Sequence, residues 1–301
     1  MILTQVEIKT LNLSFDKGGG QLTYTPDDSR RVLAAIARPA DEELANTLGN
    51  LEAVHGDNAQ IPIFVTRKLH ERAPAVCRVV NRHKHPYVAS GGSGFLVNSS
   101  ELRESIPASE SEDWKHPVLV TNNHVLSDDG RFPSVRLNYA DAVFDELGKS
   151  FAVDKILWQS PREQLDVTIA KLRCNEAPPN ITIPVNSNAR PLADCSTSKS
   201  SEKIYVIGHP LGQGLAFSLA DNQVVDHEFH APGSPAVGYC RIHYGAPTQQ
   251  GNSGGPVLDE HEFKAMGIHR AVASSPLRNR PDLDPYKANE AVAIHSVLSR
   301  L

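Results

Sequence analysis

The sequence contains few cysteines, no long apolar run and no leader-like beginning. Its four cysteines, Cys77, Cys174, Cys195 and Cys240, show no CxxC spacing, so we expect no zinc site. The sequence contains no stretch of 18 apolar residues, so we expect no transmembrane helix. The first residues, MILTQVEIKTLNLSF, lack the basic segment and continuous apolar core of a secretory signal. We therefore expect a cytoplasmic protein with reduced thiols and no membrane partner.

The sequence also lacks an excess of positive charge. The chain of 301 residues carries 30 Lys and Arg against 35 Asp and Glu, a net charge of −5. The one small basic cluster, NRHKH at 81–85, is typical of a solvated loop. Because nucleic-acid binding calls for a basic patch, we expect no nucleic-acid partner. The length suffices for one large domain or two smaller ones.

The first 72 residues differ in pattern from the rest of the chain. Residues 2–24 alternate apolar positions around a KGGG turn, which predicts a short strand pair. Residues 27–54 change to a helical period, with aspartates at 27, 28 and 41 placed to cap two helices. The interpretation is a small N-terminal α/β accessory extension, residues 1–72, which either packs as an extra layer or binds a regulatory partner.

From residue 73 onward, short β-rich runs recur between Gly, Pro, Asn and Asp. Together they predict an antiparallel sandwich or barrel, and the tail HSVLSRL predicts a closing helix. The expected strands are AVCRVV (75–80), GFLV (94–97), VLVTN (118–122), VRLNYA (135–140), FAVDKILW (151–158), VTIAKL (167–172), IYVIG (204–208), QVVDHEF (223–229), GYCRIHY (238–244), GPVLD (255–259), AMGIHRAV (265–272) and EAVAI (290–294).

The stretch GNSGGP, residues 251–256, places one serine among three glycines. Such a composition is typical of a surface turn, since Gly, Asn, Ser and Pro all form turns. It is equally typical of a nucleophile loop, in which Ser253 attacks a carbonyl and backbone N–H groups bind the oxyanion. The motif alone does not decide between the two.

Two other residues are candidate partners of Ser253, because a serine hydroxyl needs a base oriented by a carboxylate. His124 directly follows an apolar strand in VLVTNNHVL, and Asp166 stands at the entrance to another in EQLDVTIAKL. Taken singly, each is as readily a residue capping a strand or a turn. Their order along a β-rich chain, His, Asp, Ser, favours a catalytic set.

Six motifs make the chain resemble the chymotrypsin-like serine proteases, and most closely the bacterial branch of V8-like glutamyl endopeptidases and HtrA protease domains. They occur in the family's order over residues 73–301: GSGFLV (92–97), VTNNHVL (120–126), LDVTIAKL (165–172), VIGHPLG (206–212), GNSGGPVLD (251–259) and GIHRA (267–271). The resemblance implies a mainly β fold of two six-stranded antiparallel barrels, with a boundary near 175–203 and a C-terminal helix.

The resemblance also implies roles for individual residues. His124 would accept the proton of Ser253, Asp166 would orient the imidazole, and Gly251 and Ser253 would supply the N–H groups of an oxyanion hole. The reaction would be hydrolysis of a peptide bond in a protein or peptide substrate through an acyl-enzyme. It would need no metal and no other cofactor.

Departures from the digestive trypsins exclude two of their features. Asn252 replaces the aspartate that pairs with a newly cut N-terminus, so activation of that kind is not expected. Pro247 replaces the aspartate that selects Lys or Arg at the residue before the cleaved bond, called P1.

The residues expected to line the P1 pocket, S1, are Thr248, His269, Arg270 and Val272. Thr248 and His269 match the positions that bind a P1 carboxylate in glutamyl endopeptidases, although His269 is equally readable as a buried structural histidine. Val272 is apolar, and the direction of Arg270 is open. Acidic P1 preference therefore stands beside an HtrA-like enzyme with an apolar P1, and beside a binding module that retains the fold without catalysis.

Overall fold

The structure is a computed structural model. It describes residues 14–15, 22–23, 61–82, 91–102, 113–114, 116–128, 133–173, 181–186, 202–229, 240–272 and 288–301. The chain forms two compact units, Met1–Ala59 and Gln60–Leu301. The division therefore falls between Ala59 and Gln60 rather than after residue 72. No helix in these described ranges is both long and apolar enough to cross a bilayer.

The first unit contains one described element, an antiparallel strand pair. β1 (Ser14–Phe15) pairs with β2 (Leu22–Thr23). This agrees with the strand pair predicted around the KGGG turn. The helices predicted within residues 27–54 lie outside the described residues.

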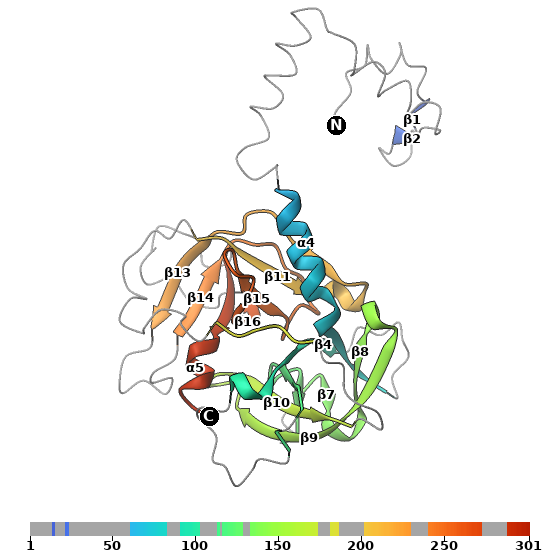
Figure 1. The fold of residues 1–301 in the computed structure, drawn as a ribbon, viewed down its shortest axis with the longest axis vertical. Coiled ribbons are helices and arrows are strands. Elements are labelled where there is room, and N and C mark those ends of the chain that lie inside the picture. Colours follow the sequence, from blue (N-terminus) through green and yellow to red (C-terminus); the bar gives the residue numbers. More distant parts are fainter. Residues whose placement is uncertain are drawn as a thin grey trace, which may run out of the picture. The chain divides into compact units, whose positions relative to one another are not determined.

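The second unit begins with the helix α4 (Ile63–Arg72), which the sequence assigned to the extension. Val65 and Leu69, one helical turn apart, are both buried in the main core of this unit. Arg72 lies in the last turn, where a cation interacts favourably with the helix dipole. Figure 1 shows α4 running along the body formed by the two sheets.

Six strands close into a barrel in the order β10-β5-β4-β3-β8-β9. Alternating side chains fill its interior, among them Val79, Leu96, Leu119 and Phe144. The strands are β3 (Val76–Asn81), β4 (Gly91–Val97), β5 (Val118–Thr121), β8 (Ala140–Phe144), β9 (Lys149–Ser160) and β10 (Val167–Leu172); a short parallel pair, β6 (Leu126–Ser127) and β7 (Val135–Arg136), follows β5.

Seven strands form the second sheet, in the order β12-β11-β15-β16-β17-β14-β13. The strands are β11 (Ile204–Gly208), β12 (Ala216–Ser218), β13 (Val224–Phe229), β14 (Cys240–Tyr244), β15 (Pro256–Asp259), β16 (Ala265–Val272) and β17 (Asn289–Ala293). Among the described residues, no pairing joins β12 to β13, so this half is an open half-barrel rather than a closed barrel of six strands. The expected mainly β class with a double-barrel architecture is otherwise confirmed.

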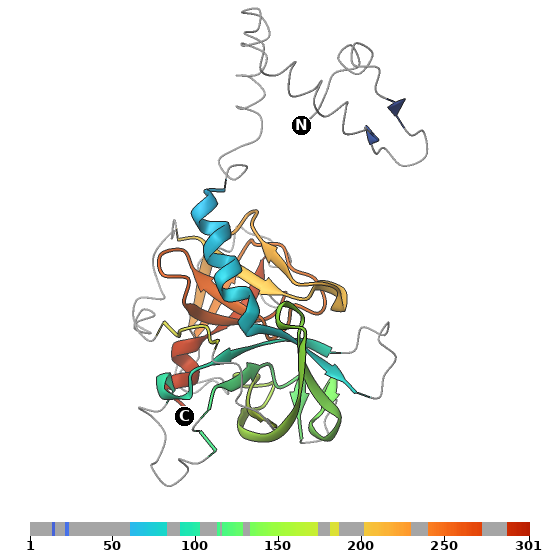
Figure 2. The ribbon, with the colours of Figure 1, turned by 45° about the vertical axis from the view of Figure 1, so that its right-hand side comes forward.

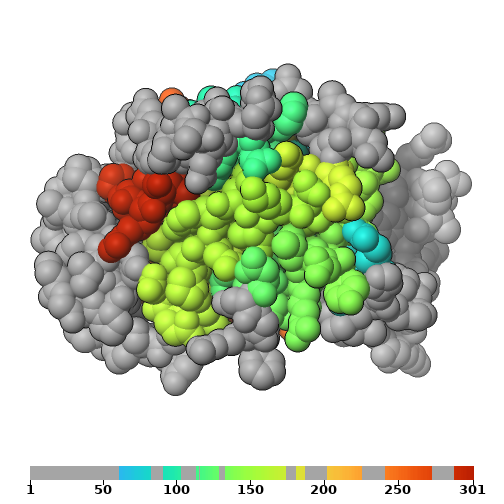
Figure 3. Space-filling view, turned by 90° about the horizontal axis from the view of Figure 1, so that it is seen from below, coloured from blue at the N-terminus to red at the C-terminus, as the bar shows by residue number. Residues whose placement is uncertain are grey.

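One core cluster joins the two halves. It contains Phe95 and Ile169 from the first barrel, Ile207 and Ile268 from the second sheet, and Leu69 from α4. The predicted C-terminal helix is present as α5 (Ile294–Leu298), and its buried Ile294 and Val297 belong to the same cluster. Figure 2 shows the second sheet above the first barrel, with α4 running in front of the second sheet down to the first barrel, and in Figure 3 the C-terminal segment lies against the strands of the first barrel. Burial of this shared core fixes the two halves against each other.

The expected strands are found close to their predicted positions, with one exception. VRLNYA (135–140) forms only the two-residue β7 and then a 3₁₀ turn at Leu137–Tyr139, and β8 follows it. Short strands such as β6 and β12 were not predicted, because two or three residues are too few to show an alternating pattern.

Candidate active site

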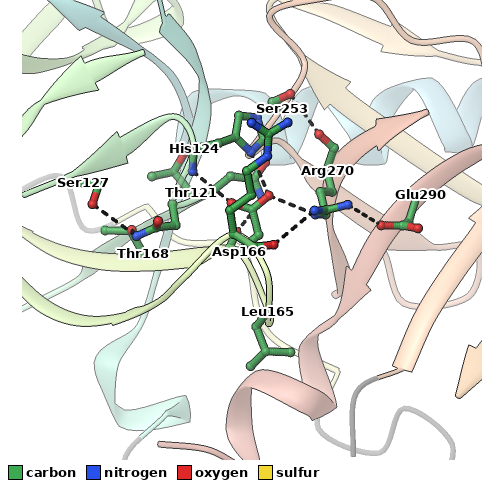
Figure 4. A network of polar contacts seen from close by, with 12 residues as sticks. Thr121, His124, Ser127, Leu165, Asp166, Thr168, Ser253, Arg270 and Glu290 are labelled. Carbon is green, nitrogen blue, oxygen red and sulfur yellow. Dashed lines mark hydrogen bonds and ion pairs between the residues drawn. The ribbon is translucent and has the colours of Figure 1, made fainter. Parts of the chain in front are cut away.

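His124 and Asp166 are held together by a dense set of hydrogen bonds in the first barrel. His124 lies between β5 and β6, and Asp166 directly precedes β10. The Asp166 carboxylate accepts the His124 N–H at 2.9 Å through Oδ1 and lies 2.8 Å from His124 Nδ1 through Oδ2 (Figure 4). An ionised carboxylate only accepts, so the imidazole donates from Nδ1 and leaves Nε2 as its acceptor.

The main chain of Asp166 is fixed as tightly as its side chain. Its carbonyl accepts hydrogen bonds from Asn122 Nδ2 at 3.0 Å and from the Asn123 N–H at 3.1 Å. Its φ of 61° lies in the left-handed region, which aspartate tolerates better than most residues. The Asp166 side chain is 1% exposed and that of His124 is 20% exposed, so the carboxylate is buried while the imidazole reaches the surface.

Ser253 lies on a turn between β14 and β15 that requires glycine at two positions. Gly251 has a φ of 102° and Gly254 a φ of 87°, values that other residues rarely adopt. A Cβ atom on Gly251 would overlap the His209 carbonyl, and one on Gly254 would overlap the Ser93 carbonyl. The two glycines therefore let the chain turn sharply around Ser253 against its neighbours.

The same turn presents backbone donors. The Gln250 carbonyl accepts the Leu211 N–H at 2.5 Å, and a trans peptide then directs the Gly251 N–H to the opposite side. Within the described part of the chain, the N–H groups of Gly251 and Ser253 have no hydrogen-bond acceptor. Two unengaged backbone donors next to a serine hydroxyl have the chemistry needed to bind an oxyanion.

The Ser253 hydroxyl makes no hydrogen bond with His124 among the described contacts. It donates instead to the Arg270 carbonyl at 3.1 Å. Nucleophile–base contacts are often loose without substrate. For His124 to act as the base, the hydroxyl would have to donate to the imidazole instead.

A cavity of about 340 Å³ brings the predicted residues together. It is lined by His124, Asp166 and Ser253, and by all four residues expected in S1: Thr248, His269, Arg270 and Val272. Val272 is exposed. The lining also includes Arg162, Gln249, Gln250 and Ala271. The sequence analysis did not assign these residues to the site, because nothing in the sequence distinguishes them except that they lie near motif residues.

His269 is buried, and its ring is held by Tyr244. The two side chains lie 2.6 Å apart, between the phenol oxygen and Nδ1. Burial, together with the nearby His124, lowers the pKa of His269 to about 3, while burial raises the pKa of Tyr244 well above its usual value. The phenol therefore keeps its proton and donates it to Nδ1. A neutral imidazole that accepts at Nδ1 carries its own proton on Nε2.

The Arg270 side chain, which lines the cavity, is held by two carboxylates. Its Nε donates to Asp166 Oδ2 at 2.9 Å, and a terminal nitrogen donates to Glu290 Oε1 at 2.9 Å (Figure 4). Burial alone raises the pKa of Glu290, but the hydrogen bond from His243 and the charges of Arg241 and Arg270 lower it to about 2. Glu290 is therefore ionised, and Arg270 lies between two carboxylates.

Ser93 on β4 connects the first barrel to the Ser253 turn. Its buried hydroxyl donates to the Gly251 carbonyl at 2.8 Å and accepts the His209 N–H at 2.9 Å. Its own N–H donates to the Ser253 carbonyl at 2.7 Å. This role could not be predicted from local patterns, because it depends on contacts between residues more than 100 positions apart.

Comparison with known proteins identifies the family. The model of the trypsin-like peptidase domain matches residues 92–268. A search of curated proteins found no match.

Solved structures of serine proteases share the fold. The M. tuberculosis Rv3671c protease is 18% identical in its active form, with a TM-score of 0.50 over 80% of this chain and 86% of that one. Its inactive form is also 18% identical, with a TM-score of 0.51 over 80% and 94%. Likeness at this level of identity concerns the fold alone. The family match covers more than half of the chain, which therefore belongs to the trypsin-like peptidases and is a serine protease.

Proposed function

We propose that this protease is an endopeptidase whose catalytic residues are His124, Asp166 and Ser253. The observation that carries the proposal is the pair of hydrogen bonds from His124 to the Asp166 carboxylate, at 2.9 and 2.8 Å, in the cavity that Ser253 also lines. They leave Nε2 of the imidazole as the free acceptor for a serine proton.

In the proposed reaction, Ser253 Oγ attacks the peptide carbonyl carbon while His124 Nε2 takes the hydroxyl proton. The N–H groups of Gly251 and Ser253 receive the negative oxygen of the tetrahedral intermediate. The C–N bond then breaks, and the imidazolium returns its proton to the leaving amine. Water enters by the reverse sequence, releases the acid from the ester and restores Ser253.

Among the described residues, one edge of β16 has no backbone partner beyond His269, and this edge offers a peptide substrate a place to bind. On one side, Ala271 and Val272 pair with β17, whereas the pairing with β15 ends at Ile268. An extended peptide can add to an open strand edge by backbone hydrogen bonds. Its N–H would compete with Ser253 for the Arg270 carbonyl and thereby release the hydroxyl toward His124.

The pocket favours an acidic P1 side chain. Thr248 and the neutral His269 are hydrogen-bond donors, and Arg162 adds a positive charge to the lining. A carboxylate accepts from several donors at once. An apolar P1, as in an HtrA-like enzyme, remains the second candidate, because Ala271 and Val272 line the same cavity.

A fluorophosphonate probe tests the catalytic assignment. We expect it to label the full-length chain on Ser253, with labelling lost in Ser253→Ala and strongly reduced in His124→Ala. A binding module with a retained fold would not be labelled. Digestion of a proteome-derived peptide library then reports P1: enrichment of Glu and Asp supports the acidic pocket, and enrichment of Leu or Val supports the apolar one.

A further inference from the structure

One oxygen of the proposed catalytic carboxylate receives two donors from opposite halves of the molecule. Asp166 Oδ2 lies 2.8 Å from His124 Nδ1 and 2.9 Å from Arg270 Nε. Because both nitrogens lie within 3 Å of one atom, they are less than about 6 Å apart. The positive charge of Arg270 therefore lies close to the His124 imidazole, on the side where the imidazole contacts Asp166.

A β-bulge turns Arg270 toward Asp166. The pairing of β16 with β17 shifts register between His269 and Ala271, which leaves Arg270 as the extra residue. Its guanidinium also donates to the Arg162 carbonyl at 3.2 Å. With three donors engaged in a rigid planar group, the side chain is held in one position.

Glu290 connects the Arg270 guanidinium to a second arginine, Arg241. It also lies 3.7 Å from Arg241 Nε. Arg241 in turn donates to the carbonyls of Gln164 and Leu165, the two residues directly before Asp166. Strands β14, β16 and β17 of the second sheet therefore hold the Asp166 turn of the first barrel by both its side chain and its main chain.

We propose that Arg270 and Glu290 act as a charge-balanced clamp on Asp166, which positions the carboxylate and sets the pH range in which His124 serves as the base. This inference rests on the proposed function. An ion pair with a purely structural role would have no need to share the oxygen that receives the imidazole.

The charges around the imidazole predict in which direction each substitution should shift the protonation of His124. On this proposal, the Arg270 guanidinium would oppose a second positive charge close to Asp166 Oδ2, and the Glu290 carboxylate would offset part of that effect. The titratable and charged groups that face this cluster come from several elements: Arg162 and Asp166 from the turn before β10, Arg241 and His243 from β14, His269 and Arg270 from β16, and Glu290 from β17. Removing the guanidinium therefore favours the imidazolium, and removing the Glu290 charge disfavours it.

The pH dependence of kcat/KM tests the clamp in the full-length enzyme. We expect Arg270→Met to move the acidic limb to higher pH by about one unit, and Glu290→Gln to move it to lower pH. Arg270→Lys should keep the limb within a few tenths of a unit of the wild type but reduce kcat at least about tenfold, because one ammonium cannot reproduce the forked contacts. Arg173→Met, which removes an equal charge from an exposed ion pair with Asp154, is the matched control and should change neither.

A second readout separates failure of the clamp from failure of the proposed function. In Ser253→Ala, the NMR titration of labelled His124 needs no turnover, and Arg270→Met added to this background should raise its pH midpoint by the same amount. An inactive wild type would refute the proposed function and leave this comparison intact. The clamp is refuted if Arg270→Met leaves the His124 midpoint within 0.2 units, as a rough threshold, or moves it downward. If Glu290→Gln does not fold, the contrast between Arg270→Met and Arg270→Lys decides.

Discussion

Replacing Ser93 with alanine should affect both stability and catalysis, because its hydroxyl joins the first barrel to the Ser253 turn. The substitution removes the acceptor of the His209 N–H and the donor to the Gly251 carbonyl, at 2.9 and 2.8 Å. A buried polar group left without a partner costs about 1–3 kcal/mol. Two such groups lower the free energy of unfolding by about 2–4 kcal/mol, since Ser93 itself is fully buried.

The catalytic loss follows from the position of the Gly251 carbonyl. Once it is unanchored, the residue that supplies one proposed oxyanion donor is free to move. Complete loss of such a donor costs about 100- to 1,000-fold in kcat, so partial misplacement should cost about tenfold.

The assay combines urea unfolding with kcat at saturating peptide. Ser99→Ala is the matched control, because Ser99 is also buried and donates to the Trp114 carbonyl away from the cavity. The control should lose stability and keep kcat. Equal kcat for Ser93→Ala and wild type would refute the link from Ser93 to the oxyanion donors.

Three further outcomes are expected. His269→Ala and Thr248→Val should each reduce kcat/KM after Glu about tenfold or more relative to cleavage after Leu, since each removes a hydrogen bond to a charged group worth about 1.5–3 kcal/mol; equal losses on matched peptides would make both residues structural. Burial lowers the pKa of His209 to about 4, so the unfolded chain binds the proton more readily than the folded chain. The free energy of unfolding should therefore fall as the pH drops from about 6.5 to 4. Urea unfolding of His209→Asn should show a shallower fall with pH, and an unchanged slope would contradict this role of His209. A chain lacking residues 1–59 should melt close to the full-length protein, whereas a chain lacking residues 1–72 also loses α4 and should melt several degrees lower. Similar melting temperatures for the two truncated chains would show that α4 is dispensable for stability. If the chain lacking residues 1–72 cleaves one fluorogenic peptide at the rate of the full-length protein, a regulatory role for residues 1–72 is excluded.

Much of the fold was predictable because its signals are local. Strands such as β5 and β10 are short apolar runs bounded by turn residues, and these patterns do not depend on distant contacts. The clustering of His124, Asp166 and Ser253 in one cavity was also expected from their motifs. The boundary at residue 72 was misplaced because α4 has the helical pattern of the extension, and only its burial assigns it to the second unit.

The supporting residues of the site were not predictable in the same way. The direction of Arg270 depends on a bulge in β16, which interrupts the alternation that otherwise tells which face a side chain occupies. Tyr244 and Glu290 lie in ordinary strand patterns, and their partners are 20 or more residues away in sequence. Such roles arise from sheet register, which a single sequence does not encode locally.

The site residues are divided between two sheets, and this division has a consequence for the assembly of the enzyme. His124 and Asp166 come from the first barrel, whereas Ser253 and His269 come from the second sheet. If these residues act as proposed, a nascent chain, or a fragment released by cleavage between the halves, would hold only part of the catalytic set and would be inactive. On this proposal, hydrolysis would begin only when both halves have docked, so the rate at which activity emerges during refolding would measure docking. Two inactive fragments that recover activity on mixing would then report their own association.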